Sequence, residues 1–460
     1  MNFWESSIWG TFNIIAVLLL SLLVANIIKR SIKPLQASLI PTSVLGGGVL
    51  LVFAWLYNTI SGREFFNESF FGGSGYNAME MITYHTLALG FIASSFKTTD
   101  GKITKQRSVE IFNTGVTTVS TYLLQAVVGF GITIVAAALF IPDFFPAAGV
   151  LLPFGYGQGT GQALNYGTIY ENDFGFQGGA SFGLTIAALG FLSASIGGVI
   201  HLSYLKRKGL IKTAAQQEGI ISSEQVQGMD EIPMQESIDK MTVQIALIAV
   251  AYMLAYFLMV LLGNLLPGMK SVIFGFNFLL GVLAATLVKF ILKLFRKYGW
   301  NTRTYTNNFL MTRACNFFFD IMVVSGIAAI RLSVLERYWG IMLILGVVGL
   351  VVTYIYNYFI AKTLFPAYAQ EQFLAMYGML TGTASTGVIL LREIDGDFKT
   401  PVSDNLVYQN FPAIVFGFPI MLLATLAPVK PILTLLLLFG FFVVMNIILF
   451  RSFIFKRKKK

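Results

Sequence analysis

The feature that most limits the fold of this chain is a series of long, unbroken apolar runs. A bilayer core takes about 20 apolar residues per helical crossing, and these runs have that length. Strict alternation of polar and apolar residues, which an outer-membrane barrel needs, is absent from them. We therefore predict an all-α polytopic membrane protein with about 11 transmembrane helices. The predicted spans are 7–28, 39–60, 79–96, 108–140, 178–204, 242–266, 271–295, 308–332, 338–362, 406–426 and 430–451.

Composition leaves little room for a soluble fold or for soluble-enzyme chemistry. Charged residues make up 12% of the chain, against roughly 25% in soluble domains. The single cysteine, Cys315, makes no intrachain disulfide. The two histidines, His85 and His201, are too far apart in sequence to suggest a zinc-type cluster. We expect a protein that is not an enzyme and needs no cofactor.

The basic residues predict how the chain crosses the membrane. They gather beside the apolar runs on one side, for example at Lys206–Lys208 and in the tail Lys456–Lys460. The net charge of +10 therefore follows the positive-inside bias and does not indicate a nucleic-acid partner. The asymmetry holds only if two Gly-rich segments, 146–169 and 370–391, each enter and leave on the same side. We predict that both are re-entrant, with the N-terminus outside and the C-terminus in the cytoplasm.

The order of the runs predicts an inverted repeat. Each half has four spans, a Gly-rich segment and one further span, and five full crossings per half give the halves opposite orientations. The segment from Gly159-Thr160-Gly161 also parallels the segment from Gly382-Thr383-Ala384. The predicted parts are residues 1–204 as the first repeat, 205–241 as a cytoplasmic linker, 242–429 as the second repeat, and 430–460 as an extra span with a basic tail.

The first Gly-rich segment predicts a broken helix that binds substrate. Alternating glycines in Gly157-Gln158-Gly159-Thr160-Gly161 would each cost a continuous helix about 1 kcal/mol. Two half-helices of about 10 residues reach about 15 Å each, half of the hydrocarbon core. The free amides and positive dipole end near Thr160 suit a carboxylate, and the loop carbonyls and its hydroxyl suit Na⁺. The alternative is a straight helix with a glycine packing seam.

The second Gly-rich segment concentrates hydroxyl groups where the first concentrates glycines. Gly382, Thr383, Ser385 and Thr386 are predicted to contact the substrate, and Thr381 and Thr383 to ligate an ion. The alternative is that these hydroxyls bond back to helix carbonyls and serve close helix packing.

Two charged residues interrupt the apolar run 308–332. Asp320 is costly at mid-membrane, so we expect it to face a partner, an ion or a cavity, either as a Na⁺ or proton site or in a structural bond with His85. Arg313 lies seven residues earlier, on nearly the same helical face. It either binds a substrate carboxylate or extends to the membrane interface.

Two stretches of the sequence carry a resemblance to a known family, namely Ile40-Pro41-Thr42-Ser43-Val44-Leu45-Gly46-Gly47 and the Gly157–Gly161 loop. They are similar to the Ile-Pro-Glu-Pro-Val-Ala-Gly-Gly and Gly-His-Gly-Thr-Gly stretches of the bacterial glutamate:sodium symporter family, which the chain resembles over nearly its whole length. Gly175-Phe176 and Gly197-Gly198 match family positions as well. The resemblance implies Na⁺-driven glutamate uptake across a bacterial inner membrane, by two inverted halves with re-entrant loops, in a homodimer with an elevator motion and Na⁺ as the coupling ion. Gln158 stands where the family has histidine.

We accordingly predict a sodium-coupled symporter that imports glutamate or a related small organic anion. One alternative is transport of a different carboxylate, and another is a cation/proton antiporter that uses Asp320. An enzyme such as a lipid-linked transferase needs carboxylate clusters in sizeable polar loops, and the outside loops are short except 61–78. A channel needs a selectivity ring that the sequence does not suggest.

Overall fold

The computed structural model describes residue 2 and residues 4–97, 104–209, 231–234, 238–299, 303–396 and 399–454, with the side chains of Ser7 and Phe411 left out. These residues form helices and no β-strand, apart from one isolated bridge between Glu231 and Thr304.

The first half of the chain contains α1 (Ser6–Ser31), α2 (Lys33–Ala37), α3 (Thr42–Ser61), α4 (Gly75–Phe96), α5 (Lys105–Leu139), α6 (Leu151–Phe174) and α7 (Gly179–Arg207). The second half contains α9 (Lys240–Leu265), α10 (Lys270–Gly275), α11 (Asn277–Lys297), α12 (Asn308–Ala328), α13 (Leu332–Leu364), α14 (Ala369–Thr381), α15 (Ala384–Arg392), α16 (Val402–Tyr408), α17 (Asn410–Leu426), α18 (Pro431–Leu449) and α19 (Arg451–Ile454). Short 3-10 turns are η1 (Phe65–Asn67), η2 (Ser69–Phe71), η3 (Pro146–Val150), η4 (Pro267–Met269) and η5 (Pro366–Tyr368).

Nine helices in the described part of the chain are long and apolar enough to cross a membrane. The predicted span 406–426 is bent: Val402–Tyr408 and Pro412–Leu426 meet at 49° and make a tenth crossing if they act as one. Pro412 lacks a backbone N–H, which accounts for a bend at this place. The predicted span 79–96 forms α4, which is not among the nine, because Glu80 and His85 lower its hydropathy. The all-helical class is therefore confirmed, and the nine or ten candidate spans among the described residues are compatible with a polytopic membrane protein, although eleven spans are not found there.

Several of these helices are apolar yet face outward. The candidate spans in α9 and α18 have mean hydropathies of 2.6 and 2.8, and only 22% of each is buried inside the protein. Exposed apolar surface on this scale marks contact with a membrane. Helix α7 differs, since 67% of its span is buried inside the protein.

The described chain divides into two compact units, and each unit combines segments from both halves of the sequence. Unit 1 consists of residues 1–79, 103–217 and 324–460, and unit 2 of residues 80–102 and 218–323. The predicted linker 205–241 lies mostly outside the described residues.

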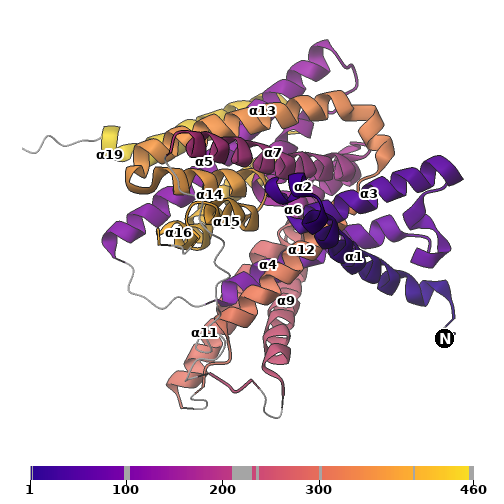
Figure 1. Cartoon of the computed structure of the whole chain (residues 1–460), viewed down its shortest axis with the longest axis horizontal. Helices are drawn as coiled ribbons and strands as arrows, with labels where there is room; N and C mark the ends of the chain where they lie inside the picture. Colours follow the sequence, from indigo (N-terminus) through magenta and orange to yellow (C-terminus); the bar gives the residue numbers. More distant parts are fainter. Residues whose placement is uncertain are drawn as a thin grey trace, which may run out of the picture. The chain divides into compact units, whose positions relative to one another are not determined.

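Helix α7 is the packing centre of unit 1, where α6, α13 and α14 pack against it. Its glycines allow close backbone contact: a Cβ at Gly190 would lie 2.5 Å from the carbonyl oxygen of Thr381. Helix α6 approaches the start of α7 equally closely, because a Cβ at Gly167 in α6 would overlap the backbone of Gly179 and Ala180. Helices α13, α5 and α7 run beside one another (Figure 1).

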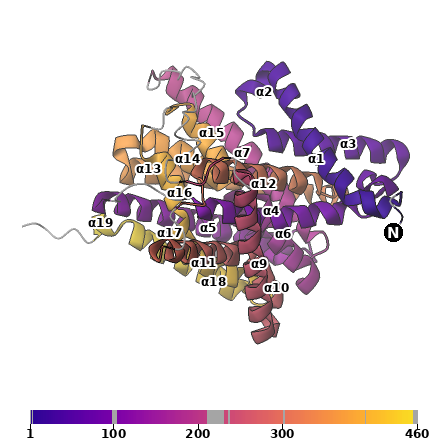
Figure 2. The same ribbon diagram turned by 90° about the horizontal axis from the view of Figure 1, so that it is seen from below.

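The first two long helices also belong to unit 1. Helix α1 packs beside α3 in both views (Figures 1 and 2). Gly47 in α3 lies against the last turns of α12, where a Cβ would be 2.6 Å from Cβ of Ile327 and 3.1 Å from the carbonyl oxygen of Val324.

Unit 2 is built from most of α4 together with α9, α10, α11 and most of α12. A Cβ at Gly281 in α11 would lie 2.8 Å from the side chain of Ile92 in α4. The fully buried Lys240, at the start of α9, forms a 2.7 Å ion pair with Glu231, whose carboxylate also accepts from Asn307 Nδ2 at 2.7 Å. This network fixes the beginnings of α9 and α12 next to each other.

Candidate functional site

The first candidate site is a break in α6 at Gly159. This residue has φ 79° and ψ −169°, a backbone region that is essentially limited to glycine. The rings of Phe154 and Tyr166, on opposite sides of the break, stack with centroids 4.0 Å apart and planes 2° apart. Twelve residues of straight helix rise about 18 Å, farther than two such rings can bridge. The two arms of α6 therefore fold toward each other.

The second candidate site is the break between α14 and α15. Gly382 has φ −149° and ψ −102°, and Thr383 is extended. The two helices pack closely along glycines: a Cβ at Gly378 would lie 2.8 Å from Cα of Gly387. Residues on either side of the turn thus face one another, which makes α14 and α15 a helical hairpin.

Helix α5 hydrogen-bonds to the backbone just before each break. The Tyr122 hydroxyl donates to the Gly157 carbonyl at 3.0 Å. The Gln125 amide, three residues along α5, donates to the Leu380 carbonyl at 2.9 Å. Both carbonyls lie next to a break, and such bonds satisfy acceptors that would otherwise be costly to bury. The two breaks are therefore held by one helix within unit 1.

The predicted residues of the first loop are almost all buried in protein. Gly157 leaves no room for a side chain, because a Cβ there would overlap the Tyr122 ring. Gln158 is half-buried, and Gly161 is buried. Thr160 is fully buried and packs against Gly326 in α12, where a Cβ would lie 2.7 Å from Cβ of Thr160.

The predicted residues of the second loop vary in exposure. Thr381 is fully buried, and its hydroxyl donates to the Tyr377 carbonyl at 2.6 Å, as in the back-bonding alternative. Thr383 is half-buried, Thr386 is buried, and their hydroxyl oxygens lie 3.4 Å apart. Ser385 is exposed at the start of α15.

The remaining predicted site residues belong to unit 2. Arg313 is exposed, with its guanidinium 5.0 Å from the centroid of the Phe309 ring. Asp320 is also exposed on α12. The His85 ring bonds through Nδ1 to the Tyr252 hydroxyl at 2.7 Å. The structure thus places Arg313 and Asp320 in a different unit from both breaks.

A polar stripe along α5 was not predicted. It consists of Thr114, Thr118, Thr121 and Gln125, which are all fully buried and spaced by three or four residues, so they share one helical face. Each bonds to an amide or hydroxyl on another element: Gln372, Gln409, Asn357 and Thr353, respectively. The recurrence of hydroxyl residues at helical spacing inside an apolar run was the available signal.

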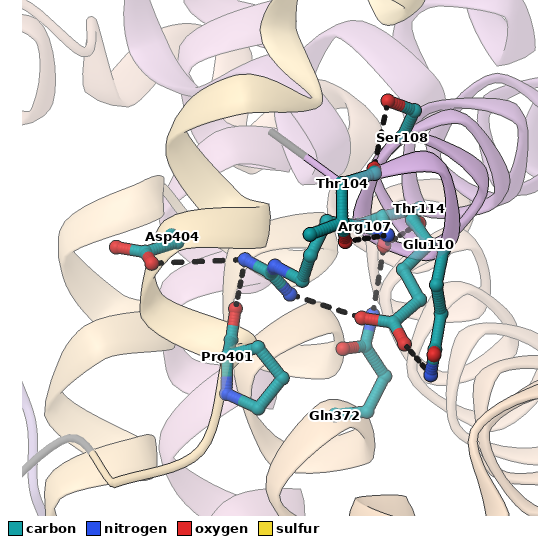
Figure 3. Close-up of polar contacts among 9 residues, drawn as sticks. Thr104, Arg107, Ser108, Glu110, Thr114, Gln372, Pro401 and Asp404 are labelled. Atoms are coloured by element: carbon teal, nitrogen blue, oxygen red, sulfur yellow. Dashed lines mark hydrogen bonds and ion pairs between the residues drawn. The ribbon is translucent and has the colours of Figure 1, made fainter. Parts of the chain in front are cut away.

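The stripe ends near a charged cluster at the start of α5 (Figure 3). Arg107 forms ion pairs with Glu110 at 3.0 Å and with Asp404 of α16 at 3.6 Å, and it donates to the Pro401 carbonyl at 3.4 Å. Burial and, after it, the hydrogen bond to Glu110 raise the pKa of Tyr368, the residue directly before α14. This cluster joins the start of α5, which carries the stripe, to α16 and to the start of α14, which leads to the second break.

Among the described residues, no group of three or more His, Cys, Asp or Glu side chains could hold a metal ion. Comparison with known proteins adds no relative: no family model, no curated protein and no solved structure matches the chain.

Proposed function

We propose that this protein is a secondary transporter that imports a small organic anion, with glutamate the first candidate, in symport with Na⁺. The observation that carries the proposal is the pair of buried helix breaks, at Gly159 and at Gly382–Thr383, tied to one helix. Irregular backbone at membrane depth persists only inside protein or beside a water-filled cavity. Broken helices near the midplane are the usual binding elements of secondary transporters.

An inverted repeat is part of the proposal. Each half places its break after four long helices and before one more, and both breaks fall at the glycines that the sequence aligns. A second correspondence comes from helix packing. Gly47 in α3 packs on α12 through Ile327, and Gly281 in α11 packs on α4 through Ile92. These are equivalent helix pairs of the two halves, and in each pair a glycine on one helix packs against an isoleucine on the other.

Anion recognition follows from the two helix starts that the breaks create. The second arm of α6 begins after Gly159, and α15 begins at Ala384. Each presents backbone N–H groups and the positive end of a helix dipole, which favour a carboxylate. The exposed Ser385 and half-buried Thr383 and Gln158 supply further hydrogen-bond partners. In this proposal the loops are re-entrant, and they move against a static part in an elevator-type mechanism within a homodimer.

The proposed location is the bacterial inner membrane, with the N-terminus outside and the C-terminus in the cytoplasm. The basic ends of α1, at Lys29 and Arg30, and of α7, at Lys206 and Arg207, support a common cytoplasmic side.

The test is uptake of radiolabelled glutamate into proteoliposomes, with an inward Na⁺ gradient or with choline in its place. Accumulation that needs Na⁺ supports the proposal. Accumulation of another carboxylate but not glutamate, from a panel of dicarboxylates and amino acids, retains the mechanism and changes the substrate. Cation/proton exchange that needs no organic anion and is abolished by Asp320→Asn contradicts it.

A further inference from the structure

Four polar side chains meet where α5 crosses α13 in unit 1. Thr121 and Gln125 are one turn apart on α5, and Thr353 and Asn357 are one turn apart on α13. All four are at most 1% exposed. Asn357 Nδ2 donates to Thr121 Oγ1 at 3.3 Å, and Gln125 Nε2 donates to Thr353 Oγ1 at 2.8 Å. Two polar side-chain pairs, called the polar quartet below, thus join α5 and α13 at this crossing.

The hydrogen bonds fix which way each amide points. Gln125 Nε2 also donates to the Leu380 carbonyl at 2.9 Å, and Asn357 Nδ2 donates to the Thr353 carbonyl at 2.9 Å. Each amide nitrogen therefore has two acceptors, and a flipped amide would turn its oxygen against them. Gln125 Oε1 and Asn357 Oδ1 remain as buried acceptors, and neither has a hydrogen-bond partner in the described part of the chain.

The surroundings suit a cation better than a neutral donor. Leu380 is the penultimate residue of α14, so the negative end of that helix dipole lies at the quartet. The candidate ligands are neutral oxygens, which suits a monovalent ion, whereas Ca²⁺ sites usually include carboxylates. Carbonyl oxygens and C-terminal helix ends at a broken helix bind Na⁺ in transporters of this general plan.

We propose that Gln125 Oε1 and Asn357 Oδ1 are ligands of a Na⁺ site at the α5–α13 crossing. The inference rests on the proposed function, because it gives the coupling ion a location beside the second break. It differs from the hydroxyl ligands expected at Thr381 and Thr383. Binding of Na⁺ here would neutralise the end of α14 and stiffen the bond between α5 and the backbone that precedes Gly382. Occupancy of the site by Na⁺ would thereby control how firmly the α14–α15 hairpin is held to α5.

The experiment measures ²²Na⁺ binding to the purified full-length protein, together with its melting temperature in NaCl and in choline chloride. Gln125→Met and Asn357→Leu remove the proposed ligands at similar volume, and Asn357→Asp keeps an oxygen. The matched control is Gln372→Met, since Gln372 is another buried glutamine that bonds to an α5 hydroxyl and has an unpartnered Oε1. We expect about tenfold or greater loss of Na⁺ affinity in the first two variants and little change in the control and in Asn357→Asp.

The outcomes separate the site from the transport function. Equal Na⁺ affinity in all variants overturns the site, even if Na⁺-driven anion uptake persists. Absence of Na⁺ binding to the unaltered protein also overturns it and leaves buried water as the partner of both oxygens. Site-dependent Na⁺ binding without uptake of any organic anion supports the site and removes the transport proposal. If a variant melts at a lower temperature in choline, the additional stabilisation by Na⁺ still reports on the site.

Discussion

Replacement of Gly159 by alanine tests the break on which the functional argument depends. A non-glycine residue at φ 79° and ψ −169° costs about 1–3 kcal/mol. Alanine also favours a continuous helix over the glycine by about 1 kcal/mol. The substitution therefore shifts the balance from the broken toward the straight helix by roughly 2–4 kcal/mol, or about 30-fold to several hundred-fold.

The assay compares uptake and melting temperature for Gly159→Ala and for a matched control, Gly175→Ala. Gly175 lies at the end of the same helix, has φ 74°, and has no atom within 4 Å of a built Cβ. Its replacement costs about 1–2 kcal/mol of backbone strain without straightening the break. We expect both variants to melt at lower temperature and only Gly159→Ala to lose uptake. Unchanged melting and uptake in Gly159→Ala would refute the reasoning.

Three further predictions concern folding rather than transport. A cysteine pair replacing Phe154 and Tyr166, in a background without the native cysteine, should be joined by a short bis-maleimide, because the rings stack at 4.0 Å; failure to link on a gel supports a straight α6. Lys240→Met should lower the free energy of unfolding by about 3 kcal/mol, because it leaves the Glu231 carboxylate without its buried partner. A second change, Glu231→Met, should restore part of that loss, and a double variant no more stable than the single one contradicts the prediction. Burial raises the pKa of Asp395, but the hydrogen bonds from Thr400 and Lys399 together lower it by more. The pKa of Asp395 is therefore below its usual value. Its carboxylate therefore stabilises the fold above about pH 4 and stops doing so as the pH falls through the lowered pKa. Melting curves should show Asp395→Asn to be less stable than the unaltered protein at pH 7, with a difference that shrinks in acid, and a constant difference contradicts this.

The positions of the breaks could be predicted from sequence because their cause is local. Glycine lowers helix stability wherever it stands, and repeated glycines in an apolar run mark the weakest point. In the structure α6 is broken at Gly159 and α14 ends just before Gly382. These are the two glycines that occupy matching positions when the two halves of the sequence are aligned.

The contacts that hold the breaks could not be predicted, because they join distant parts of the chain. Gln125 reaches a carbonyl 255 residues away, and Tyr122 reaches one 35 residues away. Periodicity shows that two residues share a helix face, and it does not show which helix they will meet. Asp320 illustrates the same limit: a carboxylate in an apolar run suggests a functional role, and the structure places it in the unit that lacks both breaks.

The division into units has a consequence for how the protein is made. Ile92 in α4 packs against Gly281 in α11, which is synthesised 189 residues later. At about 5–20 residues per second, the ribosome takes roughly 10–40 s to cover that distance. During this interval the small and aliphatic face of α4, with Ala88, Ile92 and Ala93, lacks the helix that later buries it. Lipid or the insertion machinery has to cover this face first, so α11 packs on α4 only when it displaces that temporary neighbour.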